Sequence, residues 1–250
     1  MQIIMIAGQS GVGKTFLAKT LAKQAFDCGV VPVLLSFAGP LKEEAIKKGY
    51  NKDEFPEKYR EYCQDIGATM REGDPDYWVK EMHSSISKAL KDERKHLEAG
   101  DKYWERCIII DDCRYTNEIA YGMAKDAIRI FLSSGKRHLK DEDWRHHESE
   151  ALANLIESGE GEEYRNLFQH ILYNDKTEKD LARRIKPMVP VWCGIKIGCD
   201  DGTLLCGCEN CKSRRDGNML GPDSLFGELL DLLELEEWEL DDEETEEGDT

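Results

Sequence analysis

Hydrophobic residues in this chain gather in short runs, and the longer segments between the runs have the periodicity of amphipathic helices. Runs of this length, rich in Ile, Val and Leu, are typical of buried β-strands. Their alternation with helical segments predicts an α/β fold with a five-stranded parallel sheet flanked by helices. Binding residues should then gather at the carboxyl ends of the strands. The predicted strands are Ile3–Ala7, Val31–Phe37, Cys107–Ile110, Ala127–Leu132 and Ile171–Tyr173.

Three helices in the first half of the chain can be placed from local signals. A helical run covers Phe16–Phe26, directly after the first strand and a glycine-rich loop. Asp74 and Pro75 form a cap and a first-turn proline for a later helix. Between them, Pro56 precedes a helix with an apolar stripe formed by Tyr59, Tyr62, Cys63, Ile66 and Met70.

The glycine-rich loop has the spacing G-x-x-x-x-G-K-[ST], which is typical of a phosphate-binding loop between a strand and a helix. Its glycines permit the open dihedrals with which main-chain N–H groups surround a phosphate. Lys14 supplies a positive charge and Thr15 a magnesium ligand. The competing interpretation is a glycine turn before a helix. We expect ATP to contact Gly8, Ser10, Gly11, Val12, Gly13, Lys14 and Thr15.

Two carboxylates follow the third predicted strand, at the position where phosphate-loop enzymes need an acidic group near magnesium. Either Asp111 or Asp112 could serve. Strands also commonly end in Asp as a turn residue.

Net charge argues for a small ligand. The chain carries a formal charge of −17, but Asp223–Thr250 contains fourteen Asp or Glu and no Lys or Arg, so the remainder carries only −3. That remainder lacks the basic excess that duplex nucleic acid binding demands, whereas small phosphorylated ligands fit. No segment is long and apolar enough to cross a bilayer, and the first residues lack a basic leader. We expect a soluble, cytoplasmic protein.

Composition divides the chain into three parts. Residues 1–186 form the α/β domain, residues 187–222 are rich in Cys and Gly, and residues 223–250 form an acidic tail that is partly disordered. The middle part predicts a β-hairpin that starts near Val191 and turns at Asp200–Gly202. Its cysteines predict a zinc site, with Cys199 as a competing ligand and reduced thiols as the alternative. The zinc ligands are assigned to Cys193, Cys206, Cys208 and Cys211.

Arginines mark two further candidate regions. Arg60, Gln64, Gly67 and Arg71 recur on one face of the helix after Pro56, where two guanidinium groups could hold a phosphate monoester. A solvated helix face would look the same. The basic stretch between Leu132 and Ala151 indicates a lid that closes over the transferred phosphoryl group. Its candidate catalytic arginines are Arg137 and Arg145.

Several segments together resemble the bacteriophage-type deoxynucleoside monophosphate kinases, a branch of the phosphate-loop (P-loop) nucleotide kinases. The resemblance covers roughly residues 1–186. The family usually has Asp where Gly39 stands and Pro where Thr116 stands, so the sugar and base preference is left open. Besides the loop, the matching segments are Ser36–Lys42, the Arg60 to Arg71 series, Asp74–Val79, Asp112–Glu118, His147–Glu150 and Ile171–Asp175.

The resemblance implies a P-loop NTPase fold and transfer of the γ-phosphoryl group of ATP, with Mg²⁺, to a deoxynucleoside 5′-monophosphate. It implies that Arg60, Gln64, Arg71 and Arg114 bind the acceptor, with Arg114 also catalytic beside Lys14. It further implies that Thr15 and Asp112 hold the magnesium ion and that Asn174 contacts the adenine of ATP.

Other functions remain as alternatives. A dephospho-coenzyme A kinase shares the loop and the lid but does not need the segment from Asp112 to Glu118. A protein of another class would use the loop as a nucleotide-controlled switch that acts through the Cys-rich hairpin and the tail. The tail could solubilise the chain or dock on a protein partner, and a homodimer is also left open.

Overall fold

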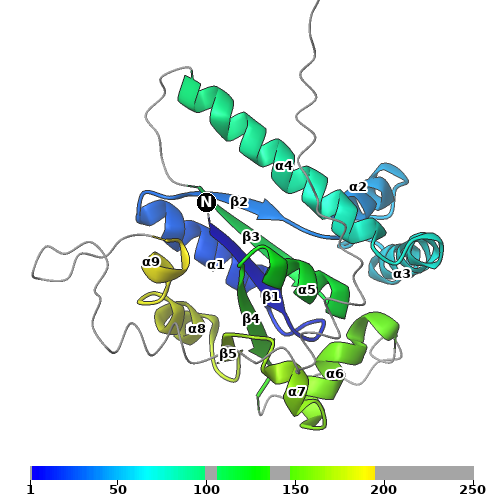
Figure 1. Ribbon diagram of the computed structural model, residues 1–250. Helices are drawn as coiled ribbons and strands as arrows, with labels where there is room; N and C mark the ends of the chain where they lie inside the picture. The colour runs from blue at the N-terminus through cyan, green and yellow to red at the C-terminus, as the bar shows by residue number, and fades with distance from the viewer. Residues whose placement is uncertain (1, 99–105, 136–146, 195–250) are drawn as a thin grey trace, which may run out of the picture.

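A computed structural model of the chain describes residues 2–98, 106–135 and 147–194. They form an α/β fold around one five-stranded parallel sheet with the strand order β2-β3-β1-β4-β5 (Figure 1). The predicted parallel sheet is therefore confirmed, and each predicted strand is present. The strands are β1 (Gln2–Ala7), β2 (Val31–Leu35), β3 (Arg106–Cys113), β4 (Ile128–Ser133) and β5 (His170–Tyr173).

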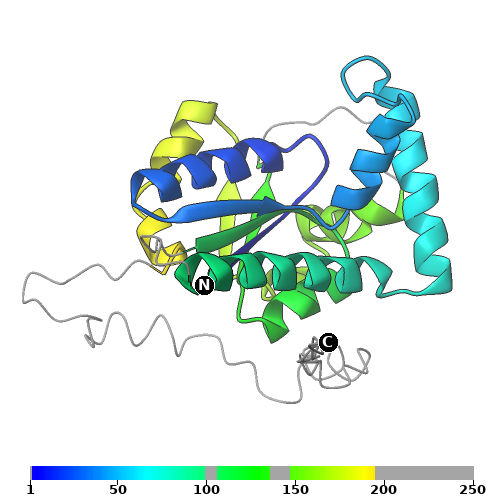
Figure 2. The ribbon, with the colours of Figure 1, turned by 90° about the horizontal axis from the view of Figure 1, so that it is seen from above.

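Helices cover both faces of this sheet. Figure 2 shows α1, α8 and α9 on one side of the strands and α4 and α5 on the other. The helices are α1 (Lys14–Asp27), α2 (Gly39–Lys47), α3 (Pro56–Gly73), α4 (Tyr77–Glu98), α5 (Thr116–Ala124), α6 (Ala151–Ser158), α7 (Glu162–Arg165), α8 (Glu178–Ile185) and α9 (Val189–Trp192), with a short 3₁₀ turn η2 (Glu148–Glu150) before α6.

The central strand β1 supplies side chains to both layers because successive residues of a strand point to opposite faces. Ile3 and Met5 pack in the core beside α4 and α5, whereas Ile4 and Ile6 pack in the core beside α1 and α8. A strand buried on both faces reads as a continuous apolar run, which is the pattern seen in the sequence. Each such buried side chain contributes about 1.5–3 kcal/mol relative to an exposed one.

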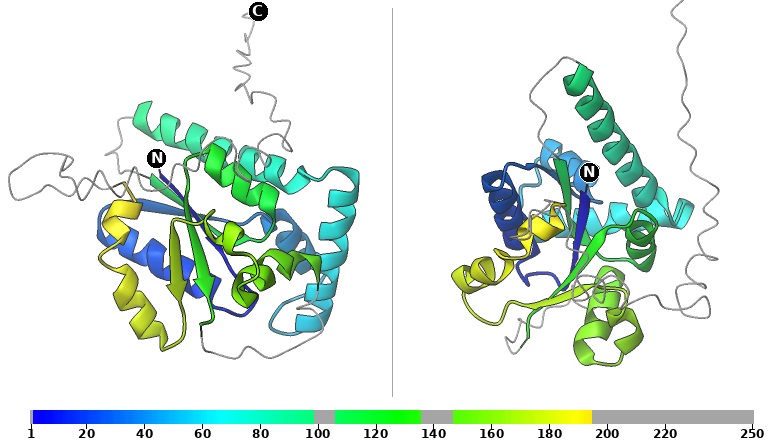
Figure 3. Two further views of the ribbon diagram at one scale, coloured as in Figure 1. Left: turned by 60° about the horizontal axis from the view of Figure 1, so that its bottom comes forward. Right: turned by 60° about the vertical axis from the view of Figure 1, so that its left-hand side comes forward.

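Strand order determines where a ligand can bind. The chain leaves β1 for the β2 side of the sheet and leaves β3 for the β4 side, so the connections diverge at the carboxyl ends of β1 and β3. The glycine-rich loop follows β1, and the two aspartates lie near the carboxyl end of β3. Figure 3 shows α2 and α3 standing beyond one end of the sheet, apart from the layers that cover its faces.

The predicted helix starts are close to those observed. α3 begins at Pro56 as expected. α4 begins at Tyr77, after a turn in which the carboxylate of Asp74 accepts a hydrogen bond from the N–H of Asp76 at 3.1 Å. Asp74 therefore caps the turn that leads into α4, and Pro75 lies in that turn rather than in the helix.

The C-terminal part of the described chain differs from the prediction. Val189–Trp192 is helical, so the first strand of the predicted hairpin is wrong where the structure describes it. Val189, Trp192 and Cys193 pack in the same core as α1 and α8. This core thus continues beyond Lys186, where the composition had suggested a domain boundary. Helix is favoured because Trp192 and Val189 then bury the same apolar face.

Within residues 2–98, 106–135 and 147–194, no helix is both long enough and apolar enough to cross a membrane.

Candidate functional site

The phosphate loop between β1 and α1 adopts the open conformation that its glycines permit. Gly8, Gly11 and Gly13 have φ angles of 142°, 78° and 105°, which disfavour other residues. A Cβ atom at Gly8 would lie 2.3 Å from the carbonyl oxygen of Leu132. The loop leads into the first turn of α1, whose main-chain N–H groups have no partner within the helix and can bind an anion.

Replacing Gly8 with Ala is expected to lower the free energy of unfolding by about 2–4 kcal/mol, because a backbone contact must open and the positive φ becomes strained. Gly29 is the matched control, since its φ is 84° and a Cβ atom there meets nothing within 4 Å. Gly29→Ala should therefore cost only about 1 kcal/mol. Urea unfolding measures both values, and equal losses would show that the contact with Leu132 is unimportant.

Lys14 is buried within the loop. Its Nζ atom donates hydrogen bonds to the carbonyls of Gly8 at 2.6 Å and Gln9 at 2.8 Å, and the residue is 7% exposed. Burial, followed by the charge of Arg114, lowers the pKa of Lys14 to about 7. A bound phosphate would favour the protonated amine again, so nucleotide binding and the charge on Lys14 are coupled.

The two aspartates near the carboxyl end of β3, Asp111 and Asp112, point in opposite directions. Thr15 Oγ1 donates a hydrogen bond to Asp111 Oδ2 at 2.9 Å. Asp112 instead accepts hydrogen bonds from the N–H of Phe37 at 2.7 Å and from Lys42 Nζ at 2.7 Å. Neighbouring residues of a strand face opposite sides, so only one of the pair can reach the loop. Of the two candidates named from the sequence, Asp111 lies beside Thr15, whereas Asp112, to which magnesium was assigned, faces away from the loop.

Asp112 ties β3 to the start of α2. Burial opposes its ionisation, but the charge of Lys42 and hydrogen bonds from Lys42, Ser36 and Phe37 outweigh burial and hold the pKa of Asp112 below its ordinary value. The N–H of Ala38 donates a further hydrogen bond at 3.2 Å. This carboxylate therefore fixes the loop between β2 and α2.

A pocket of about 380 Å³ opens beside Thr15 and Asp111. It is bounded by α1, the carboxyl end of β2, the first turn of α2 and α4. Gly39 lines it at the position where the resembling family usually has Asp, so no side chain fills that part of the wall. The polar residues around the pocket are Thr15, Lys19, Ser36, Glu43, Ser85 and Asp111.

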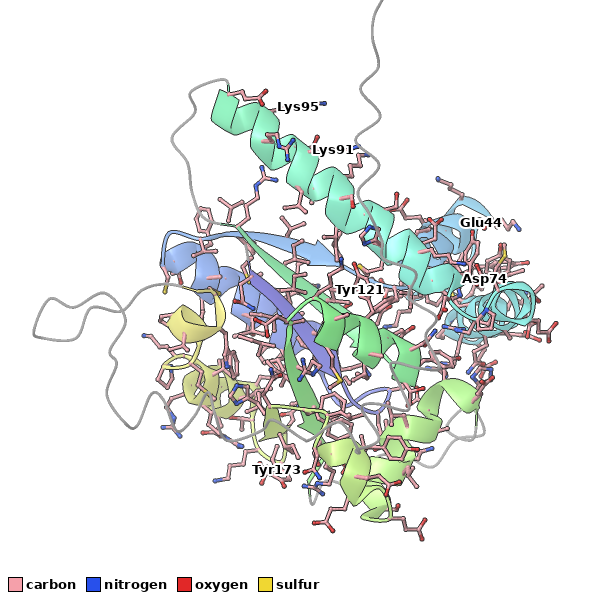
Figure 4. All side chains as sticks on the ribbon, viewed as in Figure 1. Glu44, Asp74, Lys91, Lys95, Tyr121 and Tyr173 are labelled. Atoms are coloured by element: carbon pink, nitrogen blue, oxygen red, sulfur yellow. The ribbon has the colours of Figure 1, made fainter. Side chains whose placement is uncertain are left out.

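Arg71 is held on α3 against the start of α5. Its guanidinium donates to the carbonyl of Gly67 at 3.0 Å and lies 3.7 Å from the ring centre of Tyr115. It also approaches Glu118 Oε1 at 3.7 Å. Arg60 and Gln64 lie half-buried on the same helix. Figure 4 shows Asp74 at the end of α3, on the same side of the molecule as Glu44 of α2.

The segments that carry the resemblance meet in space. Asn117 at the start of α5 donates hydrogen bonds to the Pro75 carbonyl at 3.0 Å and to Asp76 Oδ1 at 2.9 Å. Arg114, just before α5, forms an ion pair with Glu150 of η2. Segments separated by tens of residues thus converge at the carboxyl edge of the sheet.

Glu118 is a buried carboxyl group, 2% exposed, that accepts hydrogen bonds from the N–H groups of Arg114 at 2.6 Å and Tyr115 at 3.1 Å. Burial is the main influence and raises its pKa to about 7, with the charge of Asp112 adding to the shift and these hydrogen bonds opposing it. Glu118 therefore titrates near neutral pH.

A pH dependence follows from this shift. Between the ordinary value of 4.5 and about 7, the folded state binds more protons at Glu118 than the unfolded state does. The contribution of this residue to the free energy of unfolding therefore falls as pH rises through that window. Relative to Glu118→Gln, the wild-type protein should lose roughly 3 kcal/mol between pH 4.5 and 7.5. Urea unfolding of both proteins tests this, and parallel pH curves would contradict it.

Asn174 supports the loop. Its side-chain amide donates a hydrogen bond to the carbonyl of Val12 at 2.7 Å, and the residue is 6% exposed. A Cβ atom at Gly13 would lie 2.7 Å from the same amide nitrogen, so this close approach also requires glycine. The resemblance implied an adenine contact for Asn174, whereas the amide here is engaged with the loop backbone.

Several predicted site residues lie outside the described part of the chain: Arg137, Arg145, Cys199, Cys206, Cys208, Cys211 and the acidic tail. Cys193 is described, and it is buried with its thiol hydrogen-bonded to that of Cys107. This hydrogen bond and burial raise the pKa of Cys107. The structure therefore corrects the expectation that Cys193 lies on a strand of a hairpin, because Cys193 directly follows α9 and is buried in the core. The described residues hold no group of three His, Cys, Asp or Glu that could bind a metal.

Sequence reasoning missed how η2 and α6 contact the loop. The N–H of Ser10 donates to Glu150 Oε2 at 2.7 Å, and Gln9 donates to Asn154 Oδ1 at 2.8 Å. The segment His147–Glu150 was placed in the predicted lid and matched by the resemblance, but neither predicted that Glu150 contacts the loop. The sequence does contain one signal for this contact. Glu150 directly precedes the apolar helix α6, and an acidic residue that is buried beside such a helix needs a partner for its charge.

No protein-family model matches this chain, and a comparison with curated proteins also finds no match.

Proposed function

We propose that this protein is a nucleotide kinase that transfers the γ-phosphoryl group of ATP to a deoxynucleoside 5′-monophosphate, giving ADP and the deoxynucleoside diphosphate. The observation that carries the proposal is that the phosphate loop and two arginines lie at the same edge of the sheet. The glycine loop with buried Lys14 lies at the end of β1, and Arg114 follows the adjacent strand β3. Arg71, from the helix outside the layers, reaches the segment that contains Arg114. Cationic groups from the loop, from the segment after β3 and from α3 thus lie at one edge of the sheet.

The strand order supports a P-loop nucleotide kinase fold within the α/β class. The loop follows the central strand β1, and Asp111 lies near the carboxyl end of the neighbouring strand β3. Main-chain N–H groups of the loop and Lys14 would hold the donor phosphates. In the proposed complex Lys14 turns from the carbonyls of Gly8 and Gln9 toward the phosphates.

Thr15 and Asp111 fit a magnesium ion that arrives with ATP. Their oxygens are 2.9 Å apart, and both are the hard ligands that Mg²⁺ prefers. Mg²⁺ typically takes one or two protein oxygens and completes its shell with phosphate oxygens and water. When bound, it would neutralise charge on the outer phosphates of ATP. Asp111 thus replaces Asp112 in our assignment of this role.

In the proposed reaction, an anionic oxygen of the acceptor phosphate attacks the γ-phosphorus, and the bond to the oxygen that bridges to ADP breaks. The attacking oxygen already carries a charge, so no general base is required. The chain contributes positioning and charge stabilisation. Lys14 and Arg114 neutralise the transferring group, while Arg60, Gln64 and Arg71 hold the acceptor. Arg137 and Arg145 remain our candidates for additional catalytic arginines.

A cytoplasmic location fits this proposal, because ATP is the donor and the cysteines in the described part of the chain form no disulfide bonds. The cysteine-rich segment and the acidic tail stay as predicted accessory parts, for zinc binding and for a protein partner.

An acceptor screen tests the proposed function. The purified full-length protein is incubated with ATP, Mg²⁺ and each deoxynucleoside monophosphate separately, with ribonucleoside monophosphates and dephospho-coenzyme A in parallel. Products are resolved by chromatography. We expect at least one deoxynucleoside diphosphate. Phosphorylation of dephospho-coenzyme A alone would support that kinase instead, and slow hydrolysis with no phosphorylated acceptor would support the nucleotide-controlled interaction protein.

A further inference from the structure

Glu150 places a buried carboxylate at the mouth of the phosphate loop. It is 1% exposed. One carboxylate oxygen accepts the hydrogen bond from the N–H of Ser10 at 2.7 Å, and the other is paired with the guanidinium of Arg114. The first of these groups belongs to the donor site, and the second to the segment that is proposed to face the acceptor.

A carboxylate is costly to bury unless other groups compensate its charge. Two direct contacts of Glu150 are with groups that recognise phosphate, namely a main-chain N–H of the loop and an arginine, and the charge of Lys14 also interacts with this carboxylate. The carboxylate resembles part of a phosphoryl group in its negative charge and in its paired oxygens. It lies between the loop that would hold ATP and the arginine that would stabilise the transferring group.

The surroundings of Glu150 differ from those of the other acidic residue on the same turn. Glu148 on the same turn is exposed, so the two acidic residues of η2 differ in environment. Gln9 is bonded to Asn154 of α6, which holds η2 and α6 against the loop independently of Glu150. Removing the charge at Glu150 therefore leaves one of the two contacts between the loop and this segment in place.

We propose that the carboxylate of Glu150 occupies the position of the transferring phosphoryl group and must be displaced when a nucleoside triphosphate binds. A diphosphate lacks the third phosphoryl group and leaves Glu150 in contact with Ser10 and Arg114. Glu150 thereby weakens ATP binding relative to ADP binding and holds Arg114 in place until a γ-phosphoryl group arrives. The inference rests on the proposed function only for the binding of ATP at the loop.

Calorimetric titration of the full chain with ADP and with AMP-PNP, the β,γ-imido analogue of ATP, tests this inference in the presence of Mg²⁺. The quantity compared is the Kd for ADP divided by the Kd for AMP-PNP. Glu150→Gln removes the competing charge, so this ratio should rise about tenfold over that of the wild type. The matched variant Glu148→Gln, on the same turn, should leave the ratio unchanged.

An unchanged or lower ratio in Glu150→Gln overturns the inference and makes Glu150 a support for Arg114 and the loop. If Glu150→Gln does not fold, Glu150→Asp decides in its place. The shorter side chain keeps its charge near Arg114 but draws back from Ser10, so the ratio should again rise, and an unchanged or lower ratio overturns the inference.

The outcome is separable from that of the acceptor screen. A higher ratio with no phosphorylated acceptor would preserve the role of Glu150 and remove the kinase. A phosphorylated acceptor with an unchanged ratio would support the kinase and overturn the role proposed for Glu150.

Discussion

Lys14→Met is expected to lower kcat for phosphoryl transfer by about 10³-fold or more, which corresponds to roughly 4 kcal/mol of lost transition-state stabilisation. The amine is the cation closest to the loop carbonyls, and Met keeps a long apolar side chain but cannot neutralise the transferring group. Initial rates of diphosphate formation at saturating ATP and acceptor measure the effect.

The same substitution should not destabilise the fold. Lys14 is 7% exposed, and its lowered pKa means that the charge is held in the loop at an energetic cost. Lys14→Met should therefore unfold in urea at the wild-type concentration or above it. Full activity in this variant would contradict the assignment of Lys14 to catalysis. Unfolding of the variant at a lower urea concentration than the wild type would contradict the predicted stability.

Separate substitutions of Asp111 and Asp112 are expected to affect different properties, kcat in the first case and stability in the second. Asp112→Asn breaks the ion pair with Lys42 and weakens the hydrogen bond from Phe37, so the free energy of unfolding should fall by about 3 kcal/mol. Asp111→Asn removes only a hydrogen bond near the surface and should change stability by less than about 1 kcal/mol. Its kcat should instead fall roughly 10²- to 10³-fold, through loss of the proposed magnesium oxygen.

Each variant is the control for the other, because the two residues are adjacent and carry the same charge. Urea unfolding and steady-state kinetics over a range of Mg²⁺ concentrations measure the two effects. A large stability loss in Asp111→Asn, or a higher magnesium requirement in Asp112→Asn alone, would reverse the two roles and restore the assignment made from sequence.

The sheet could be predicted from the sequence because its inner strands β1, β3 and β4 are largely buried and read as apolar runs, and the partly exposed edge strands β2 and β5 are also short apolar runs. Strand ends were less accurate, as polar Arg106, Asp111 and Asp112 continue β3 beyond its apolar part. The largest error concerns Val191–Cys193, where glycine and cysteine further along the chain suggested a hairpin. Packing of Trp192 and Cys193 against the core favours a helical turn, and that tertiary preference is invisible in local composition.

The parts of the candidate site that are formed by neighbouring residues in the sequence could be predicted, and the parts formed by distant residues could not. The glycine loop is continuous in sequence, and its three positive φ angles follow directly from the motif. The choice between Asp111 and Asp112 depends on which face of β3 each residue occupies, which requires the exact register of the strand. Glu150 and Asn174 reach the loop from more than a hundred residues away, so only the folded structure reveals these contacts.

The central claim is that the phosphoryl group passes from ATP to a nucleotide rather than to water. Incubating the protein with ATP labelled at the γ-phosphate and a deoxynucleoside monophosphate accepted in the screen, then separating the products, measures this directly. The account predicts that the label appears in the deoxynucleoside diphosphate, at a rate that depends on acceptor concentration and is lost in Lys14→Met. Label recovered only as inorganic phosphate, at a rate independent of the acceptor, would contradict it.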